Sequence, residues 1–232
     1  MSSIGDSSYQ ICLEGNIGAG KSTLLEYFST QPGVDVLPET LQLWRNLPLP
    51  GTQEKHNLLE SFYQDPSKHT FSFQSYVMLT KVAQHLAPSP KPVKLLERGL
   101  HSMYHIFSKA LEREGHFPML EFAVHTQWHE HFQTQHSETM PDLIIWLKTS
   151  PIVNYERVQR RARAEEMAIS LDYLTLLSDL HEKWLSSSPF ADRTIVIDGD
   201  GTKADVLQAF QAAMESALPD EIKARLAAFP GN

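Results

Sequence analysis

The stretch EGNIGAGKST, residues 14–23, places three glycines, a lysine and two hydroxyls directly after the apolar run YQICL. Residues 15–22 match the pattern G-x-x-x-x-G-K-[ST] in full, between an expected strand and an expected helix. Glycines allow consecutive backbone N–H groups to turn toward phosphate oxygens, and the start of the helix adds a positive dipole end. The stretch therefore predicts a P-loop that binds a nucleoside triphosphate, rather than a chance glycine turn.

Each polar side chain of this loop has an expected role in binding a nucleotide. Lys21 provides a positive charge for the β- and γ-phosphates, and Ser22 offers a hydroxyl to a magnesium ion. The residues expected to contact ATP are Gly15, Asn16, Ile17, Gly18, Ala19, Gly20, Lys21, Ser22 and Thr23.

Short apolar runs alternate with helical patterns along the rest of the chain. Two segments, 103–111 and 120–128, repeat apolar residues at helical spacing. The runs are nearly continuous, as in strands buried on both faces of a parallel sheet. They cover residues 11–14, 34–37, 93–96, 143–147 and 194–197. This order predicts one α/β domain over residues 1–232, with a five-stranded parallel sheet, helices on both faces and an ordered core at about 9–218.

Composition narrows the possible partners and compartments. The net charge of −8 argues against nucleic acid as a partner, because phosphate backbones attract basic proteins. No apolar run approaches the roughly 20 residues that span a bilayer, so no membrane partner is expected. A single cysteine, Cys12, suits a reducing compartment. We expect a cytoplasmic protein, or a mitochondrial one if a presequence is missing.

Charged residues follow two of the expected strands. Glu39 comes after the second run, and Glu97 ends the third and precedes Arg98. Ligands of open α/β sheets bind beyond the carboxyl ends of the strands. A carboxylate there could accept the proton of an attacking hydroxyl or hold magnesium, and an adjacent arginine would keep it ionised. The alternative for each is a solvated loop residue.

A second charged feature is the arginine-rich segment RVQRRARAEE, residues 157–166. An isolated run of this kind is usually a solvated helix face with ion pairs. In a P-loop protein it could instead close over the triphosphate as a lid, at about residues 157–168. No Asn-Lys-x-Asp motif is present, so a switch GTPase is disfavoured.

Several longer motifs resemble one family. EGNIGAGKST, PETLQLWRN, FYQDPSKHTFSFQSYV, LLERGLHSMYHIF, DLIIWLKTSPIVNYERVQRRARAEE and LHEKWL occur in the order typical of animal-type deoxyribonucleoside kinases. The resemblance covers residues 10 to about 200 and is closest to the branch of mitochondrial thymidine kinases and insect multisubstrate kinases. It implies transfer of the γ-phosphate of ATP to the 5′-hydroxyl of a deoxyribonucleoside, with Mg²⁺ as cofactor and a homodimer as the assembly.

The resemblance also implies roles for individual residues. Glu39 would be the general base, Arg98 would position the hydroxyl and the phosphate, and Glu97 would support magnesium. The base pocket would be lined by Trp44, Phe73 and Phe107, with paired hydrogen bonds from Gln74. Tyr63 and Glu166 would hold the sugar 3′-hydroxyl, while Arg161 and Arg163 would form the lid.

Three positions depart from the family pattern. Glycine stands at position 99 where the family has serine, so the orientation of Arg98 is open. Met103 replaces alanine or aspartate, and Lys81 replaces methionine or arginine. Without a charge at position 103, selection of a purine is disfavoured, and a methionine can move aside for a methyl group. We therefore expect a pyrimidine deoxynucleoside, with thymidine and deoxycytidine not ranked.

The histidines offer a possible metal site on the second helical segment. His125 and His129 are four residues apart, with His131 close by. That spacing can present two imidazoles to zinc. No acidic third ligand forms a recognisable motif, so we expect a solvated or partly buried helix surface instead.

Three other functions remain as alternatives to a pyrimidine deoxynucleoside kinase. The first is a deoxynucleoside kinase that prefers purines. The second is a nucleoside monophosphate kinase, which would need an additional phosphate site in the acceptor pocket. The third is a nucleotide switch without kinase chemistry.

Overall fold

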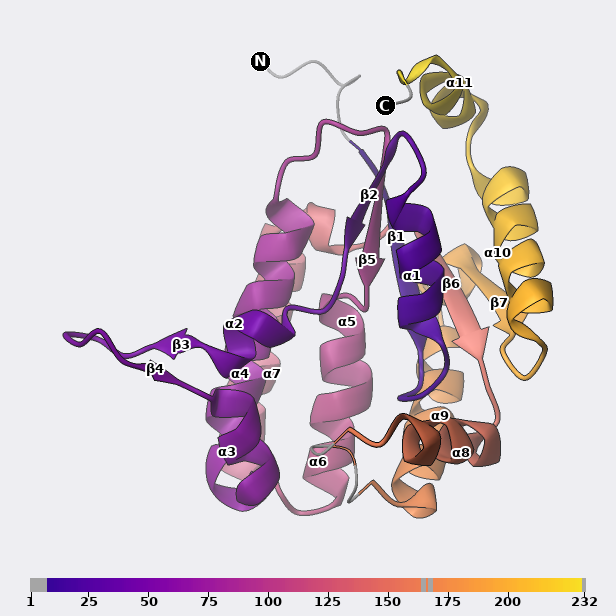
Figure 1. Cartoon of the computed structure of the whole chain (residues 1–232). Helices are drawn as coiled ribbons and strands as arrows, with labels where there is room; N and C mark the ends of the chain where they lie inside the picture. Colours follow the sequence, from indigo (N-terminus) through magenta and orange to yellow (C-terminus); the bar gives the residue numbers. More distant parts are fainter. Residues whose placement is uncertain (1–7, 164–165, 167–168, 231–232) are drawn as a thin grey trace.

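The computed structural model describes residues 8–163, 166 and 169–230, and its centre is a sheet of five parallel strands (Figure 1). In the sheet, Ile11 of the central strand lies opposite Leu95 on one side and Leu143 on the other. The strands are β1 (Tyr9–Gly15), β2 (Val34–Leu37), β5 (Val93–Glu97), β6 (Leu143–Lys148) and β7 (Thr194–Asp198), in the order β2-β5-β1-β6-β7. The five predicted strands and the α/β class are confirmed.

Helices cover both faces of the sheet, which explains why the strands are largely apolar. One face packs against α1 (Lys21–Ser29), α10 (Lys203–Ala217) and α11 (Asp220–Ala228), and the rings of Phe28 and Phe210 meet there at 4.7 Å. The other face packs against the π-helical segment η1 (Met103–Ser108) and α9 (Leu171–Leu185). Helix α11 lies beyond residue 218, the expected end of the core.

The remaining elements extend the molecule beside the sheet (Figure 1). Helices α3 and α4 meet at Asp65, whose carboxylate accepts the N–H of Lys68, and Pro66 occupies the first turn of α4. These elements are α2 (Leu41–Arg45), the ribbon β3 (Leu47–Pro48) and β4 (Lys55–His56), α3 (Leu58–Gln64), α4 (Pro66–Leu86), α5 (Leu100–Ser102), α6 (Lys109–Arg113), α7 (Met119–Gln135), α8 (Pro151–Arg161) and the turns η2 (Ser137–Thr139) and η4 (Ala191–Arg193).

The order of the strands determines where a ligand site can form. From β1 the chain moves to one side, through β2 and β5, and then crosses to β6 and β7 on the other side. A crevice forms beyond the carboxyl ends of strands where the direction of winding reverses. In Figure 1 these ends face α8 and the start of α9.

Helix α7 forms where the spacing of apolar residues predicts a helix, but its apolar stripe faces outward. Leu120 is 78% exposed and Trp128 is 49% exposed, whereas His125 and His129 are buried. An apolar stripe usually faces the core, and in this helix it faces outward instead. In the described part of the chain, no helix has the length and hydropathy of a bilayer-spanning segment.

Candidate active site

A cavity of about 1110 Å³ opens at the carboxyl ends of the strands. It joins the P-loop to Glu39, Glu97 and Arg98, and it continues toward α2, α3, α4 and η1. Of the residues predicted for the site, all line this cavity except Gly15 and Asn16. Those that line it are Ile17, Gly18, Ala19, Gly20, Lys21, Ser22, Thr23, Glu39, Trp44, Tyr63, Phe73, Gln74, Glu97, Arg98, Met103, Phe107, Arg161, Arg163 and Glu166.

Glycines of the P-loop adopt backbone conformations that side chains rarely allow. Gly18 has a φ of 80°, and a Cβ atom there would lie 2.6 Å from the carbonyl oxygen of Asn154. A Cβ at Gly15 would lie 2.8 Å from the carbonyl oxygen of Leu147. Helix α1 begins directly after Gly20, with no side chain capping its first N–H groups. These groups and the tight loop form the kind of concave backbone surface that binds phosphate.

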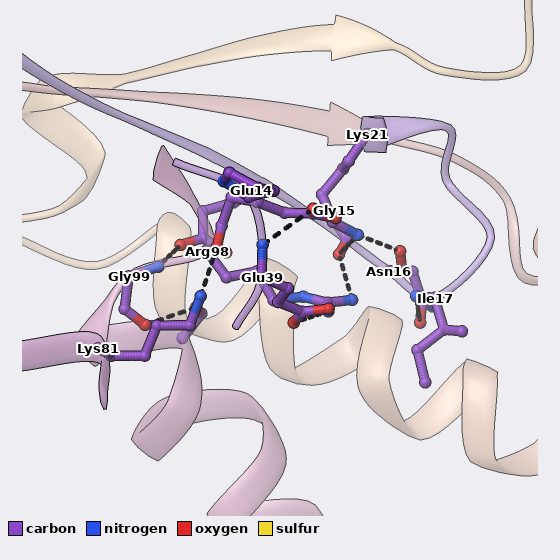
Figure 2. A network of polar contacts seen from close by, with 12 residues as sticks. Glu14, Gly15, Asn16, Ile17, Lys21, Glu39, Lys81, Arg98 and Gly99 are labelled. Carbon is purple, nitrogen blue, oxygen red and sulfur yellow. Dashed lines mark hydrogen bonds and ion pairs between the residues drawn. The ribbon is translucent and has the colours of Figure 1, made fainter. Parts of the chain in front are cut away.

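Polar contacts hold the P-loop in shape (Figure 2). Lys21 Nζ donates to the carbonyl oxygens of Gly15 and Asn16, at 3.0 and 2.8 Å. The Asn16 amide donates to the carbonyl of Leu174 on α9 at 2.8 Å, and its oxygen accepts the N–H of Ile17. Burial, and then the charge of Arg98, lower the pKa of Lys21 to about 7. Negative phosphate oxygens would favour the charged form of this lysine.

Glu39 and Arg98 form a partly buried ion pair where the P-loop part of the cavity meets the part that extends toward α2, α3, α4 and η1. Arg98 Nη1 donates to Glu39 Oε1 at 2.5 Å (Figure 2). Burial alone would raise the pKa of Glu39, but neighbouring positive charges, above all Arg98, hold that pKa well below its usual range. Arg98 has a φ of 57°, a strained conformation that persists only where surrounding contacts impose it. The site therefore holds an ionised carboxylate.

Lys81 is fully buried beneath this pair and does not line the cavity. Its ammonium donates to the carbonyl oxygen of Glu97 at 2.6 Å, and its positive charge lowers the pKa of Glu39. In the sequence analysis, Lys81 stands at a position where the related kinases have methionine or arginine, depending on the base that they accept. In the fold, Lys81 instead contributes to the electrostatics of the strand ends.

The departure at position 99 has a steric explanation. A Cβ atom at Gly99 would lie 2.9 Å from Cys12 Sγ and 3.0 Å from His85 Nε2. That His85 nitrogen accepts the N–H of Leu100 at 3.2 Å, so the ring is held in place. Gly99 N–H donates to Glu14 at 2.9 Å and thereby orients the backbone next to Arg98. Serine would not fit here without movement of a neighbour.

The acceptor end of the cavity has aromatic walls from α2, α3, α4 and η1. Phe62 of α3 and Phe73 of α4 stack with their ring centres 4.6 Å apart and their planes 16° from parallel. Trp44 of α2 meets Phe73 edge-on, and its indole N–H donates to Thr80 at 3.0 Å. Phe107 also lines the cavity, with the guanidinium of Arg98 4.8 Å from its ring centre. Flat walls of this kind suit a planar ring.

Gln74 presents a polar group in this otherwise apolar region. Its side chain is buried and lines the cavity. Ser108 Oγ approaches Gln74 Oε1 at 3.5 Å, the outer limit for a hydrogen bond, and makes shorter contacts with Met103 O and His125 Nε2. The Gln74 amide is therefore weakly held and can present either its donor or its acceptor to a ligand.

The arginine-rich segment is held by ion pairs in the structure. Glu166 accepts from Arg161 at 2.5 Å and from Arg163 at 3.4 Å. Arg157 donates to the carbonyls of Ala19 and Gly199, which ties α8 to the P-loop. Of the predicted lid at 157–168, residues 164, 165, 167 and 168 lie outside the described residues. The lid role and the sugar contact of Glu166 stay predictions.

Several cavity-lining residues are missing from the sequence-based site, among them the aromatic residues Phe62 and Tyr173. Phe62 stacks on Phe73, and Tyr173 lines the cavity from the first turn of α9, where burial raises the pKa of its phenol. The motif FYQD contains Phe62 directly before the predicted Tyr63, so the motif was a usable signal. For Tyr173 no pattern was available, because its place follows from how α9 packs beside the P-loop.

The buried histidines also differ from expectation. His125 and His129 lie in the interior rather than on a solvated surface, and His131 is exposed. Their i, i+4 spacing does not make them a pair. His129 instead approaches His101 and His105, two residues from a different helical segment. The packing of α7 against η1 brings these three together.

Comparisons with known proteins agree with this geometry. The family model of deoxynucleoside kinases matches residues 11–220. Mitochondrial thymidine kinase 2 of the macaque Macaca fascicularis is 37% identical over 214 residues, covering 91% of this chain and 78% of that protein. Deoxycytidine kinase 2 of chicken is 33% identical over 252 aligned positions, covering 95% of this chain and 93% of that protein.

A viral protein is also similar. The probable deoxycytidine kinase of fowlpox virus is 37% identical, with 84% of this chain and 81% of that protein covered. The family model covers both the P-loop and the acceptor end of the cavity, so the similarity is not limited to nucleotide binding. The chain thus belongs to the deoxynucleoside kinase family, whose members are phosphotransferases.

Proposed function

We propose that this kinase transfers the γ-phosphate of ATP to the 5′-hydroxyl of a pyrimidine deoxyribonucleoside, for nucleotide salvage. One observation carries the proposal. A single cavity joins the phosphate-binding loop, the ionised Glu39 and a slot walled by aromatic rings. The slot suits a planar base, and the carboxylate lies between the slot and the loop, where a sugar hydroxyl would meet a phosphate.

Catalysis would rest mainly on positioning and charge, as in other phosphoryl transfers. The P-loop N–H groups and Lys21 would hold the triphosphate. Glu39 would accept the proton of the 5′-hydroxyl, because its carboxylate stays ionised at neutral pH. Arg98 already contacts Glu39 and reaches the carbonyl of Gly15 at 3.4 Å, so it would stabilise charge that develops between the carboxylate and the phosphate.

Magnesium fits the residues present at the phosphate end. Ser22 and Glu97 both line the cavity there and supply oxygen ligands, which this hard cation prefers. We propose that these two residues hold Mg²⁺ with the triphosphate. The ion, when bound, neutralises charge on the phosphate oxygens. Glu97 also accepts the N–H of Glu39 at 3.4 Å, so the same side chain would keep the general base in register.

The pyrimidine preference rests on Gln74 and Met103. Thymine offers a ring N–H beside a carbonyl, and cytosine offers a ring nitrogen beside an amino group, so the two bases need opposite amide orientations. The weak contact of Gln74 with Ser108 permits both orientations. Met103 is buried, uncharged and flexible, so it offers no charged partner to a purine amino group. The thymidine and deoxycytidine kinases among the relatives support this choice.

A direct assay tests the proposal. The chain is incubated with ATP, Mg²⁺ and each of the four deoxyribonucleosides separately, and monophosphates are separated by chromatography. We expect thymidine and deoxycytidine to be phosphorylated faster than both purine nucleosides. Preferential turnover of a purine nucleoside would refute the base preference. In parallel incubations with the four monophosphates as acceptors, turnover of the monophosphates alone would identify a nucleoside monophosphate kinase.

We further propose a homodimer that pairs the outward face of α4 and α7. That face exposes Leu79 and Leu86 of α4 together with Met119, Leu120, Val124 and Trp128 of α7. A large exposed apolar area usually marks an interaction site. Sedimentation should show a dimer, and Leu120→Asp should shift it toward monomer. Ile152→Asp, at an exposed apolar residue of α8, is the matched control and should leave the dimer intact.

Cell fractionation can determine the cellular compartment of this chain. Thymidine kinase 2 of macaque and human is named as a mitochondrial protein. We propose the cytoplasm for this chain, with mitochondria as the alternative. Fractionation of cells that produce the protein would distinguish the two.

A further inference from the structure

Three histidines gather on the side of η1 that faces away from the nucleoside cavity. His101 of α5 and His105 of η1 are four residues apart on one helical segment, and His129 comes from α7. One ring nitrogen from each lies within 4.8 Å of the other two. None of the three lines the cavity, although Met103 and Phe107 of the same segment do. The cluster is separate from the proposed kinase site.

Polar atoms of this cluster lack partners. His101 is 2% exposed and His129 is 3% exposed. Neither ring nitrogen of His101 makes a hydrogen bond of good geometry, and Nε2 of His129 makes none. A buried polar group without a partner costs free energy, so such groups in native proteins usually have an explanation. Here the unpartnered nitrogens belong to residues that converge on one point.

Aromatic packing fixes the three rings and keeps them uncharged. His129 stacks on Tyr104 at 4.2 Å between ring centres, and His105 stacks on Trp184 at 5.6 Å. Phe190 packs against both His101 and His105. Burial lowers the pKa of each histidine of the cluster to about 3. Neutral imidazole is the form that binds metal ions, so no proton has to be displaced first.

We propose that His101, His105 and His129 bind one divalent transition-metal ion, of the zinc class. Imidazole nitrogen suits zinc, copper and nickel, whereas magnesium and calcium prefer oxygen. In a zinc site the metal–nitrogen distance is about 2.0–2.1 Å, so each nitrogen would have to move inward by less than about 1 Å. Three protein ligands leave a fourth position for water. The ion would cross-link η1 and α7.

The positive charges around the cluster act against a bound cation. Lys109 Nζ lies 3.3 Å from His105 Nδ1 and 5.2 Å from the ring centre of Tyr104. Arg193 also lowers the pKa of His101 through its charge. A metal ion would have to displace or neutralise Lys109, whose own pKa is lowered by burial. Removal of the Lys109 charge should therefore leave metal binding intact or make it tighter.

The test uses the whole chain without nucleotide. The protein is stripped of metal with a chelator, the chelator is removed, and cobalt(II) is titrated in. Cobalt in a nitrogen site close to tetrahedral absorbs visible light, and zinc then displaces it. We expect one cobalt ion per chain, loss of the absorption with zinc, and a higher thermal midpoint with zinc than without. Absence of this absorption, with no zinc-dependent shift in the midpoint, would overturn the proposal.

Variants separate this cluster from other metal-binding groups. His129→Asn should weaken binding by more than about 100-fold, because loss of a direct ligand exceeds the usual effect of outer-shell changes. His125→Asn is the matched control, since His125 is buried on the same helix outside the cluster. Circular dichroism without metal checks that both variants fold.

Two further variants keep the proposal falsifiable if His129→Asn does not fold. His105→Gln alters the least buried member of the cluster and should also weaken binding by more than about 100-fold. Binding that survives this substitution would overturn the proposal. Lys109→Met should bind cobalt at least as tightly as the parent chain, and loss of binding would mean that the lysine holds the metal.

Discussion

The phosphate end and the acceptor end of the cavity are built in different ways. The phosphate end is lined by seven consecutive residues, 17–23, and its shape depends on backbone conformation. The acceptor end takes single side chains from α2, α3, α4 and η1, which are far apart in the chain. A backbone site recognises what all triphosphates share, whereas a side-chain site can be altered one residue at a time. The contrast accounts for relatives named for different nucleosides within one family.

The largest expected effect lies at the boundary between the two ends. Glu39→Gln should lower kcat by about 10²–10⁴-fold with little change in either KM, because the amide cannot accept the proton. Steady-state kinetics with both substrates would measure this. Glu26→Gln, an exposed cavity-lining residue of α1, is the control and should behave as the parent chain. A loss of only a few-fold in Glu39→Gln would refute the base assignment.

The stability of the fold should depend on pH through Glu14, the buried residue directly before the P-loop. Burial raises the pKa of Glu14 to about 7, against the opposing effects of the Gly99 N–H and Arg98. Because the folded pKa exceeds the unfolded one, the protonated form favours folding, and this contribution is lost as pH rises from about 4.5 to 7. Glu14→Gln should remove this loss. The free energy of unfolding of the variant, relative to that of the parent chain, should therefore be about 3 kcal/mol higher at pH 8 than at pH 4.

Denaturant unfolding at pH 4, 6 and 8 would measure this prediction. The informative quantity is the difference between the variant and the parent chain at each pH, because other groups affect both proteins alike. The glutamine can keep the hydrogen bond from Gly99. If that difference does not change with pH, Glu14 is not the titrating group.

The phosphate end should be sensitive to one added methyl group. Gly18→Ala combines a positive φ with a Cβ contact of 2.6 Å and should cost about 1–3 kcal/mol, seen as a higher KM for ATP. Gly51→Ala is a matched control, since Gly51 has a φ of 75° with nothing within 4 Å of an added Cβ. An equal effect on the KM of ATP and of the nucleoside would mean that the two ends do not act separately.

The acceptor end should respond in selectivity and not in ATP binding. Met103→Ala enlarges the slot and should change the ratio of kcat/KM for thymidine over deoxycytidine by up to about 1–3 kcal/mol. The favoured direction is toward thymidine, whose methyl group gains room. Met78→Ala removes a buried methionine of α4 that does not line the cavity, so it controls for general loss of packing. A changed KM for ATP in Met103→Ala would break the separation of the two ends.

Local patterns were sufficient for much of the fold. The apolar runs ended close to the observed strand bounds, because strands that are buried on both faces are nearly continuous runs of apolar residues. The P-loop was recognisable because its residues are consecutive. The outward orientation of the apolar stripe of α7 could not be recognised, since Leu120 and Trp128 have the same spacing as residues of a core-facing helix. Spacing says that residues share a face, but not which way the face points.

Sequence alone determined the P-loop, the five strands and those cavity-lining residues that lie in recognisable motifs, because each depends on local spacing or on motifs in a known order. Only the tertiary structure decided which charges meet. It placed Lys81 beneath Glu39 and Glu97 rather than in the base pocket, and it left no room for a side chain at Gly99. It also brought His129 to His101 and His105. The physical reason is that contacts between distant segments depend on how helices pack, which no local pattern encodes.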